Sequence, residues 1–178
     1  PRWAKATLEE ILGVTNVNHL EVQNSYVDKA KGKGPVREQS SEILWTGVLD
    51  SGRVMYGVGA DDAHGQGYAG KTWTMAWADA LSIDSISKAF KGGHFYGSTG
   101  PKITSYEVNA QGIKLTSDGK AVEFIGKGGK VLAKSDSGSG SYAFKGDEVY
   151  VRATVINGDR WAFCQPFFIG KSEAWSAR

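Results

Sequence analysis

The sequence predicts an α/β part followed by an all-β part, and two observations carry this prediction. Up to residue 100, segments with helical apolar spacing alternate with short apolar strands, the order typical of parallel sheets. Beyond Pro101, short segments of alternating apolar and polar residues are bounded by turn residues. This pattern indicates a small antiparallel Ig-like β-sandwich. We therefore expect one domain over residues 1–100 and a second over 101–178.

The first part is predicted to order its elements helix, strand, helix, strand. Thr7 and Glu10 form a capping box that begins a short helix, and a strand follows over 17–22. A second helix is predicted over 42–51 and a second strand over 54–58. This alternation favours parallel pairing, and hence an α/β barrel or an open sheet.

The first part closes with one more strand and one more helix. Residues 72–78 alternate as a strand does, and Ser82 is a candidate N-cap for a helix that Gly92 and Gly93 would end. His94 follows directly, where an imidazole could cap the helix and, if cationic, suit its dipole.

The second part is predicted to hold seven short strands, over 103–108, 113–116, 121–125, 130–134, 141–145, 148–156 and 160–169. The Ser- and Gly-rich segment 135–140 lies between two of them. It is too short for a linker and is predicted to be a hairpin loop.

Composition excludes several classes of protein. With 178 residues, 40% hydrophobic and 22% charged, the chain can bury a core and is neither disordered nor membrane-spanning. A net charge of +2 without a dense basic block does not favour nucleic acid as a partner. Cys164 is the single cysteine, which excludes an internal disulfide and a cysteine-rich metal site.

The strongest candidate site is the turn Asp61-Asp62-Ala63-His64, which follows the predicted strand over 54–58. Catalytic and ligand-binding groups collect at the carboxyl ends of strands in α/β folds. Asp62 and His64 are two residues apart, so both can point the same way from an extended turn. A carboxylate with an imidazole suits zinc, manganese or iron, and the two residues are candidate metal ligands.

Three neighbouring residues are candidates for the second shell or the pocket. Asp61 could be a further ligand, but a partner for His64 or a turn former is the favoured role. Glu21 and Asn24 come at the end of the strand predicted over 17–22 and could line the pocket, or be purely structural.

A basic loop follows that strand and contains Lys31, Lys33 and Arg37. If the metal site exists, this loop would lie at the same edge and could attract an anionic substrate. A solvated loop is the favoured alternative.

Other motifs are set aside. Residues 65–72 match a phosphate-loop pattern, but Trp73-Thr-Met-Ala-Trp77 continues as a strand and not as the helix that phosphate binding requires. No nucleophile elbow supports a hydrolytic triad. His19 lies within a predicted strand, and packing is its favoured role.

Blocks along the chain, in order, resemble the PHP (polymerase and histidinol phosphatase) superfamily of metal-dependent phosphoesterases, in the branch with a C-terminal β-sandwich. The blocks are Pro1–Trp3, Leu20–Asn24, Val54–His64, Ala89–Pro101 and Arg160–Ile169.

The resemblance implies the C-terminal part of a distorted (β/α)7 barrel, and a site that binds two or three divalent metal ions in the complete enzyme. Asp62 and His64 match the last metal-binding block of the family. The family's earlier ligands, including an N-terminal His-x-His pair, have no counterpart, and His94 stands where the family tends to have Arg. The resemblance further implies a bacterial protein and favours an exported or periplasmic location.

Two ligands cannot hold a catalytic cluster, so we expect residues 1–178 to be a fragment of a longer hydrolase, inactive alone. A missing segment or a second chain would complete the barrel, and a small phosphate ester would be the substrate. The alternative is a non-catalytic binding module or degenerate pseudoenzyme, whose sandwich and tryptophans bind a glycan or a protein. The tryptophans considered for this role are Trp73, Trp77, Trp161 and Trp175.

Overall fold

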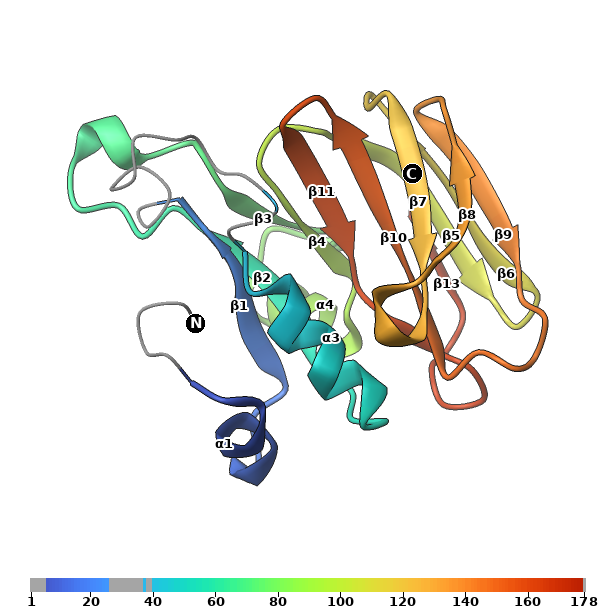
Figure 1. Ribbon diagram of the computed structural model, residues 1–178. Coiled ribbons are helices and arrows are strands. Elements are labelled where there is room, and N and C mark those ends of the chain that lie inside the picture. Colours follow the sequence, from blue (N-terminus) through green and yellow to red (C-terminus); the bar gives the residue numbers. More distant parts are fainter. Residues whose placement is uncertain (1–5, 26–36, 38–39, 178) are drawn as a thin grey trace.

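A computed structural model describes residues 6–25, 37 and 40–177 (Figure 1). Its α-helices are α1 (Leu8–Gly13), α3 (Glu42–Asp50) and α4 (Ile83–Gly92). Its strands are β1 (His19–Asn24), β2 (Tyr56–Ala60), β3 (Trp73–Ala76), β4 (Phe95–Ser98), β5 (Ile103–Asn109), β6 (Gly112–Ser117), β7 (Ala121–Ile125), β8 (Val131–Ser135), β9 (Ser139–Ala143), β10 (Tyr150–Asn157), β11 (Arg160–Cys164), β12 (Phe167–Phe168) and β13 (Trp175–Ala177).

These strands form three sheets. The seven-stranded sheet has the order β3-β4-β11-β10-β7-β8, with β12 beside β10, and the four-stranded sheet has the order β13-β5-β6-β9. Both are antiparallel throughout. The third sheet is the pair β1–β2, which is parallel.

The seven-stranded sheet packs against other elements on both faces. Successive side chains of β11 show this, because they alternate between two cores. Ala162 and Cys164 face the core shared with the four-stranded sheet. Trp161 and Phe163 point the other way, into a core shared with α3 and the β1–β2 pair. In Figure 1 the sheet accordingly stands between the four-stranded sheet and the helix-bearing part.

The predicted fold class is wrong for residues 1–100. Helices and strands do alternate there, but β3 pairs antiparallel with β4, and β4 pairs antiparallel with β11. The described residues therefore form a mostly antiparallel β fold with one parallel pair, and not a portion of a (β/α)7 barrel. Local apolar spacing identified the elements, but strand direction depends on pairing with residues 160–164.

The division at residue 100 stays a prediction, although one sheet draws strands from both sides of it. β3 and β4 precede residue 100, whereas β11 and β10 follow it. The loop 135–140 does not close a hairpin, because β8 pairs with β7 and β9 pairs with β6 in the other sheet.

The predicted helix starts are confirmed. Thr7 caps α1 with the reciprocal bonds of a capping box, in which Glu10 is the partner. The Ser82 side chain accepts a hydrogen bond from the amide of Ser85, and Gly93 ends α4 in the left-handed conformation. No described helix is long and apolar enough to cross a membrane.

Candidate functional site

The candidate metal-binding turn leaves the carboxyl end of β2. Because β1 and β2 run parallel, with Asn24 opposite Ala60, the residues after each strand emerge at one edge. Asp62 therefore lies beside Asn24, one of the two residues predicted to line the pocket or to be purely structural.

The backbone at Asp62 turns sharply and its carboxylate is held from the neighbouring strand. Asp62 has a φ of 49°, in the left-handed region that few non-glycine residues adopt. Nδ2 of Asn24 donates to Oδ2 of Asp62 at 3.2 Å. The Asp62 side chain remains 43% exposed. An uncommon backbone conformation with a positioned carboxylate is a frequent property of functional turns.

His64 is oriented by the same turn. Its Nδ1 lies 2.7 Å from the carbonyl oxygen of Asp62 and 3.9 Å from Oδ1 of that residue. A carbonyl only accepts, so Nδ1 donates here, and in the neutral imidazole the lone pair lies on Nε2. In many metal sites one ring nitrogen of a histidine binds the metal, and the other donates to a backbone carbonyl that fixes the orientation of the ring.

Asp61 anchors the loop that follows. Its carboxylate accepts hydrogen bonds from the amides of Gly70, Lys71 and Thr72, at 2.6 to 2.7 Å. This places Asp61 as a turn former, one of the two roles that the sequence favours. No helix begins at Lys71, since only a short 3₁₀ turn over Gln66–Tyr68 precedes it and β3 follows.

Another predicted pocket residue, Glu21, does not join the turn. Glu21 lies in the middle of β1, opposite Val58, and not at the edge where the turn emerges. Lys31 and Lys33 fall outside the described residues.

Arg37 is engaged in ion pairs. Its guanidinium donates to Glu42 at 2.7 and 2.9 Å and to Glu123 at 2.9 Å. Burial alone would lower the pKa of Arg37, but these two carboxylates outweigh it and raise the pKa. The two carboxylates thus compensate the Arg37 charge, which could otherwise have attracted an anionic substrate.

The other histidines lie outside the turn. The His19 ring packs among Tyr56, Phe90 and Phe95, as expected for a packing residue. His94 lies just after α4, and burial together with the charge of Lys88 lowers the pKa of its imidazole. A neutral His94 does not supply the cation that the helix dipole would favour.

The donor set at the turn fits part of a metal site. Carboxylate oxygen and imidazole nitrogen suit zinc, manganese or iron. Within the described part of the chain, however, no three His, Cys, Asp or Glu side chains come together as a metal site. The turn offers two ligands, and further ones would have to come from elsewhere.

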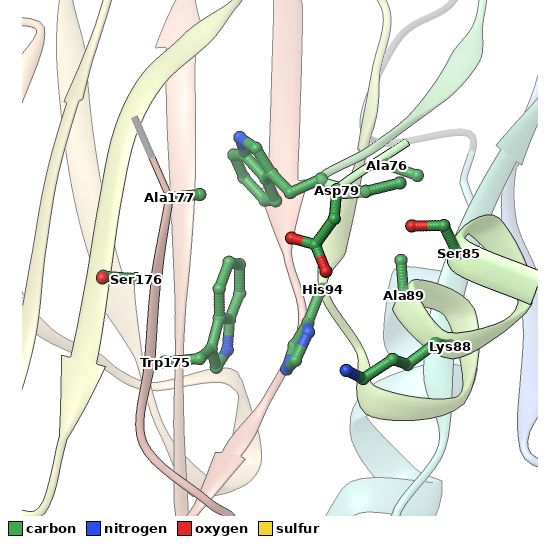
Figure 2. Close-up of a pocket in the computed structure, with 11 residues that line it drawn as sticks. Ala76, Asp79, Ser85, Lys88, Ala89, His94, Trp175, Ser176 and Ala177 are labelled. Carbon is green, nitrogen blue, oxygen red and sulfur yellow. The ribbon is translucent and has the colours of Figure 1, made fainter. Parts of the chain in front are cut away.

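A second feature combines two of the tryptophans considered for glycan or protein binding, Trp77 and Trp175, with polar residues that were not predicted to accompany them. We name it the tryptophan cleft (Figure 2), and it is lined by Trp77, Asp79, Ser85, Lys88, His94 and Trp175, with small residues between them. Trp175 comes from β13, which reaches the cleft by pairing with β5. No local pattern links Trp175 to Asp79 or Lys88, so the sequence offered the tryptophans as candidates but not the cleft that they form with these residues.

Comparisons of the chain with protein-family models, with curated proteins and with solved structures find no match.

Proposed function

We propose that this chain supplies part of the metal site of a phosphoesterase of the PHP type, with Asp62 and His64 as ligands. One observation carries the proposal: both side chains lie on the turn at the carboxyl edge of the parallel pair β1–β2. There, Asn24 holds the carboxylate and a carbonyl holds the imidazole. This support is geometric, and the resemblance of the sequence blocks agrees with it.

The roles of the residues follow from their contacts. Asn24 orients Asp62 from the neighbouring strand, and the carbonyl of Asp62 selects the His64 tautomer with its lone pair on Nε2. Asp61 keeps the loop over 70–72 against the turn. Asp62 and His64 would contribute to holding a divalent metal, which would supply an activated water and polarise a phosphoryl oxygen. The remaining ligands come from a further segment or a second chain, and the substrate is a small phosphate ester.

The test combines metal content with hydrolysis. Residues 1–178 and the native protein in its full length are dialysed against zinc or manganese and assayed with p-nitrophenyl phosphate and its diester. Asp62→Ala with His64→Ala should reduce metal content in both and abolish hydrolysis by the native protein. Asp147→Ala with Asp159→Ala, at two exposed positions outside the turn, is the matched control.

Each outcome has a meaning. Unchanged metal content and turnover in the Asp62 and His64 double variant would overturn the proposal. Metal binding that depends on both residues, but no hydrolysis of either ester by the native protein, would instead favour a degenerate, non-catalytic protein.

A further inference from the structure

The tryptophan cleft has the size of a small-molecule site. Its volume is about 510 Å³, and pockets for small ligands span about 300–1,000 Å³. It lies between the end of β3, helix α4 and strand β13, so its walls come from segments far apart in the sequence (Figure 2).

Two tryptophans form the aromatic wall, and the core supports them. The ring centroids of Trp77 and Trp175 are 5.2 Å apart, and those of Trp175 and His94 are 4.6 Å apart. Both tryptophans also pack on the buried Tyr106, at 6.0 and 4.9 Å. Because packing on Tyr106 holds both rings in place, they form a preformed apolar surface in the cleft.

The indole N–H groups of this wall contrast with those of the buried tryptophans. Trp45 donates to the carbonyl oxygen of Met55, and Trp161 donates to Oε1 of Gln23. For Trp77 and Trp175, no acceptor is found among residues 6–25, 37 and 40–177. These two half-buried side chains thus retain donors for a ligand.

The polar side chains that line the cleft also have hydrogen-bonding groups available for a ligand. Asp79 follows β3, Lys88 lies on α4 and His94 directly precedes β4. Their side chains make no hydrogen bond or salt bridge to any described residue. Figure 2 shows the Asp79 carboxylate and the Lys88 amine pointing to the same space as His94. A neutral His94, as its lowered pKa indicates, can both donate and accept.

The charges select among ligand classes. Lys88 disfavours a cation in this aromatic cleft, and Asp79 disfavours a polyanion. A ligand with apolar C–H faces can stack on the indole rings, and its hydroxyl groups can exchange hydrogen bonds with the donors and acceptors of the cleft. We propose that the tryptophan cleft binds a neutral saccharide. This site is independent of the proposed metal-binding turn.

The cleft has room for more than one sugar unit. Lys88, His94 and Trp175 also line an adjoining cavity of about 510 Å³, which extends toward Tyr56 and Phe167. An oligosaccharide could therefore run past the shared His94–Trp175 pair.

The experiment measures binding of neutral hexasaccharides to the full chain by calorimetry and saturation-transfer NMR. The probes are hexamers of β-1,4-glucose, α-1,4-glucose, β-1,4-mannose, β-1,4-xylose and β-1,4-N-acetylglucosamine, with choline and oligogalacturonate as charged comparisons. At least one neutral hexamer should bind. Asp79→Ala should weaken its binding about tenfold, the loss expected from one hydrogen bond. Asp147→Ala, an exposed carboxylate away from the cleft, should leave it unchanged.

The aromatic wall is tested with a pair of variants, because truncation could loosen β13. Trp175→Ala should abolish binding, whereas Trp175→Phe, which keeps a stacking face, should retain part of it. The Asp62 and His64 double variant should bind as the wild type does, which separates this proposal from the phosphoesterase proposal. The proposal is overturned if no neutral hexamer binds, if only a charged probe binds, or if Asp79→Ala and Trp175→Ala bind as the wild type does.

Discussion

Arg152 carries a charge into the core. Its side chain is 1% exposed, and its guanidinium donates to Glu42 at 2.6 Å and lies 4.9 Å from the Trp45 ring centroid. Glu42 in turn receives Arg37, so one carboxylate serves two guanidinium groups. A buried pair of this kind adds little stability over apolar packing, but removing one partner leaves the other charge uncompensated.

Glu42→Gln should therefore lower the free energy of unfolding by about 3–5 kcal/mol. Urea titration followed by circular dichroism measures the change. Glu107→Gln, at an exposed position on β5, is the control and should change stability by less than about 0.5 kcal/mol. Equal effects of the two substitutions would show that the buried Arg152 tolerates the loss of its carboxylate partner at little cost.

The same carboxyl group should make stability depend on pH. Burial alone would raise the pKa of Glu42, but the hydrogen bonds and charges of Arg37 and Arg152 outweigh it and lower the pKa below 4.5. Since the folded pKa is below the unfolded one, the stabilisation is complete above about pH 5 and is lost as the pH falls through the folded pKa. Unfolding titrations at several pH values should show this component in the wild type and not in Glu42→Gln.

At the scale of the element, β4 depends on a glycine that lets a ring approach its backbone. A Cβ atom at Gly97 would overlap the ring of Phe163 on the neighbouring strand β11. Gly57 on β2 faces the same ring, together with Val22 and Trp45. These glycines allow the β1–β2 pair and the seven-stranded sheet to pack closely.

Gly97→Ala should destabilise the protein by about 1–3 kcal/mol, because the added methyl group overpacks this contact. Gly13→Ala is the matched control, since nothing lies within 4 Å of a Cβ atom there. Thermal unfolding of both variants measures the difference. A melting temperature for Gly97→Ala equal to that of the control would mean that Phe163 moves aside without cost.

The elements also show what the sequence could and could not predict. The caps of α1 and α4 involve residues three positions apart, so local patterns identified both helix starts. The pairing of β4 with β11 joins residues more than sixty positions apart, for which no local pattern exists. Gly57 serves close packing against Val22, Trp45 and Phe163, a role that depends on distant residues and that no local pattern indicates. For the site, Asp62 contacts both Asn24 and His64, and their role as a metal site stays a prediction. The tryptophan cleft depends on the non-local pairing of β13.

At the scale of the whole molecule, the two cores share one sheet and should unfold together. Cys164 lies in this sheet and is 1% exposed, and burial raises the pKa of its thiol. In the native protein the thiol is therefore shielded from reagents and protonated. Both properties slow its reaction with an alkylating agent, because the thiolate is the reactive form.

Iodoacetamide should modify Cys164 only as fast as the molecule unfolds globally. Mass spectrometry follows the labelling, and its urea dependence should match that of global unfolding by circular dichroism. Ser141→Cys, at an exposed position on β9, should be labelled at once in the same chain. Rapid native labelling of Cys164 would mean that the two cores open separately.

Large and small side chains alternate along β11, and this alternation limits where the protein can gain or lose residues. Trp161 and Phe163 fill one core while Ala162 and Cys164 fill the other, so gaining or losing one residue within the strand would exchange large and small side chains across the sheet. One core would then be overpacked, and the other would contain a cavity. Insertions and deletions should therefore be confined to the turn at Gly158 and Asp159, while single substitutions within β11 disturb only one side.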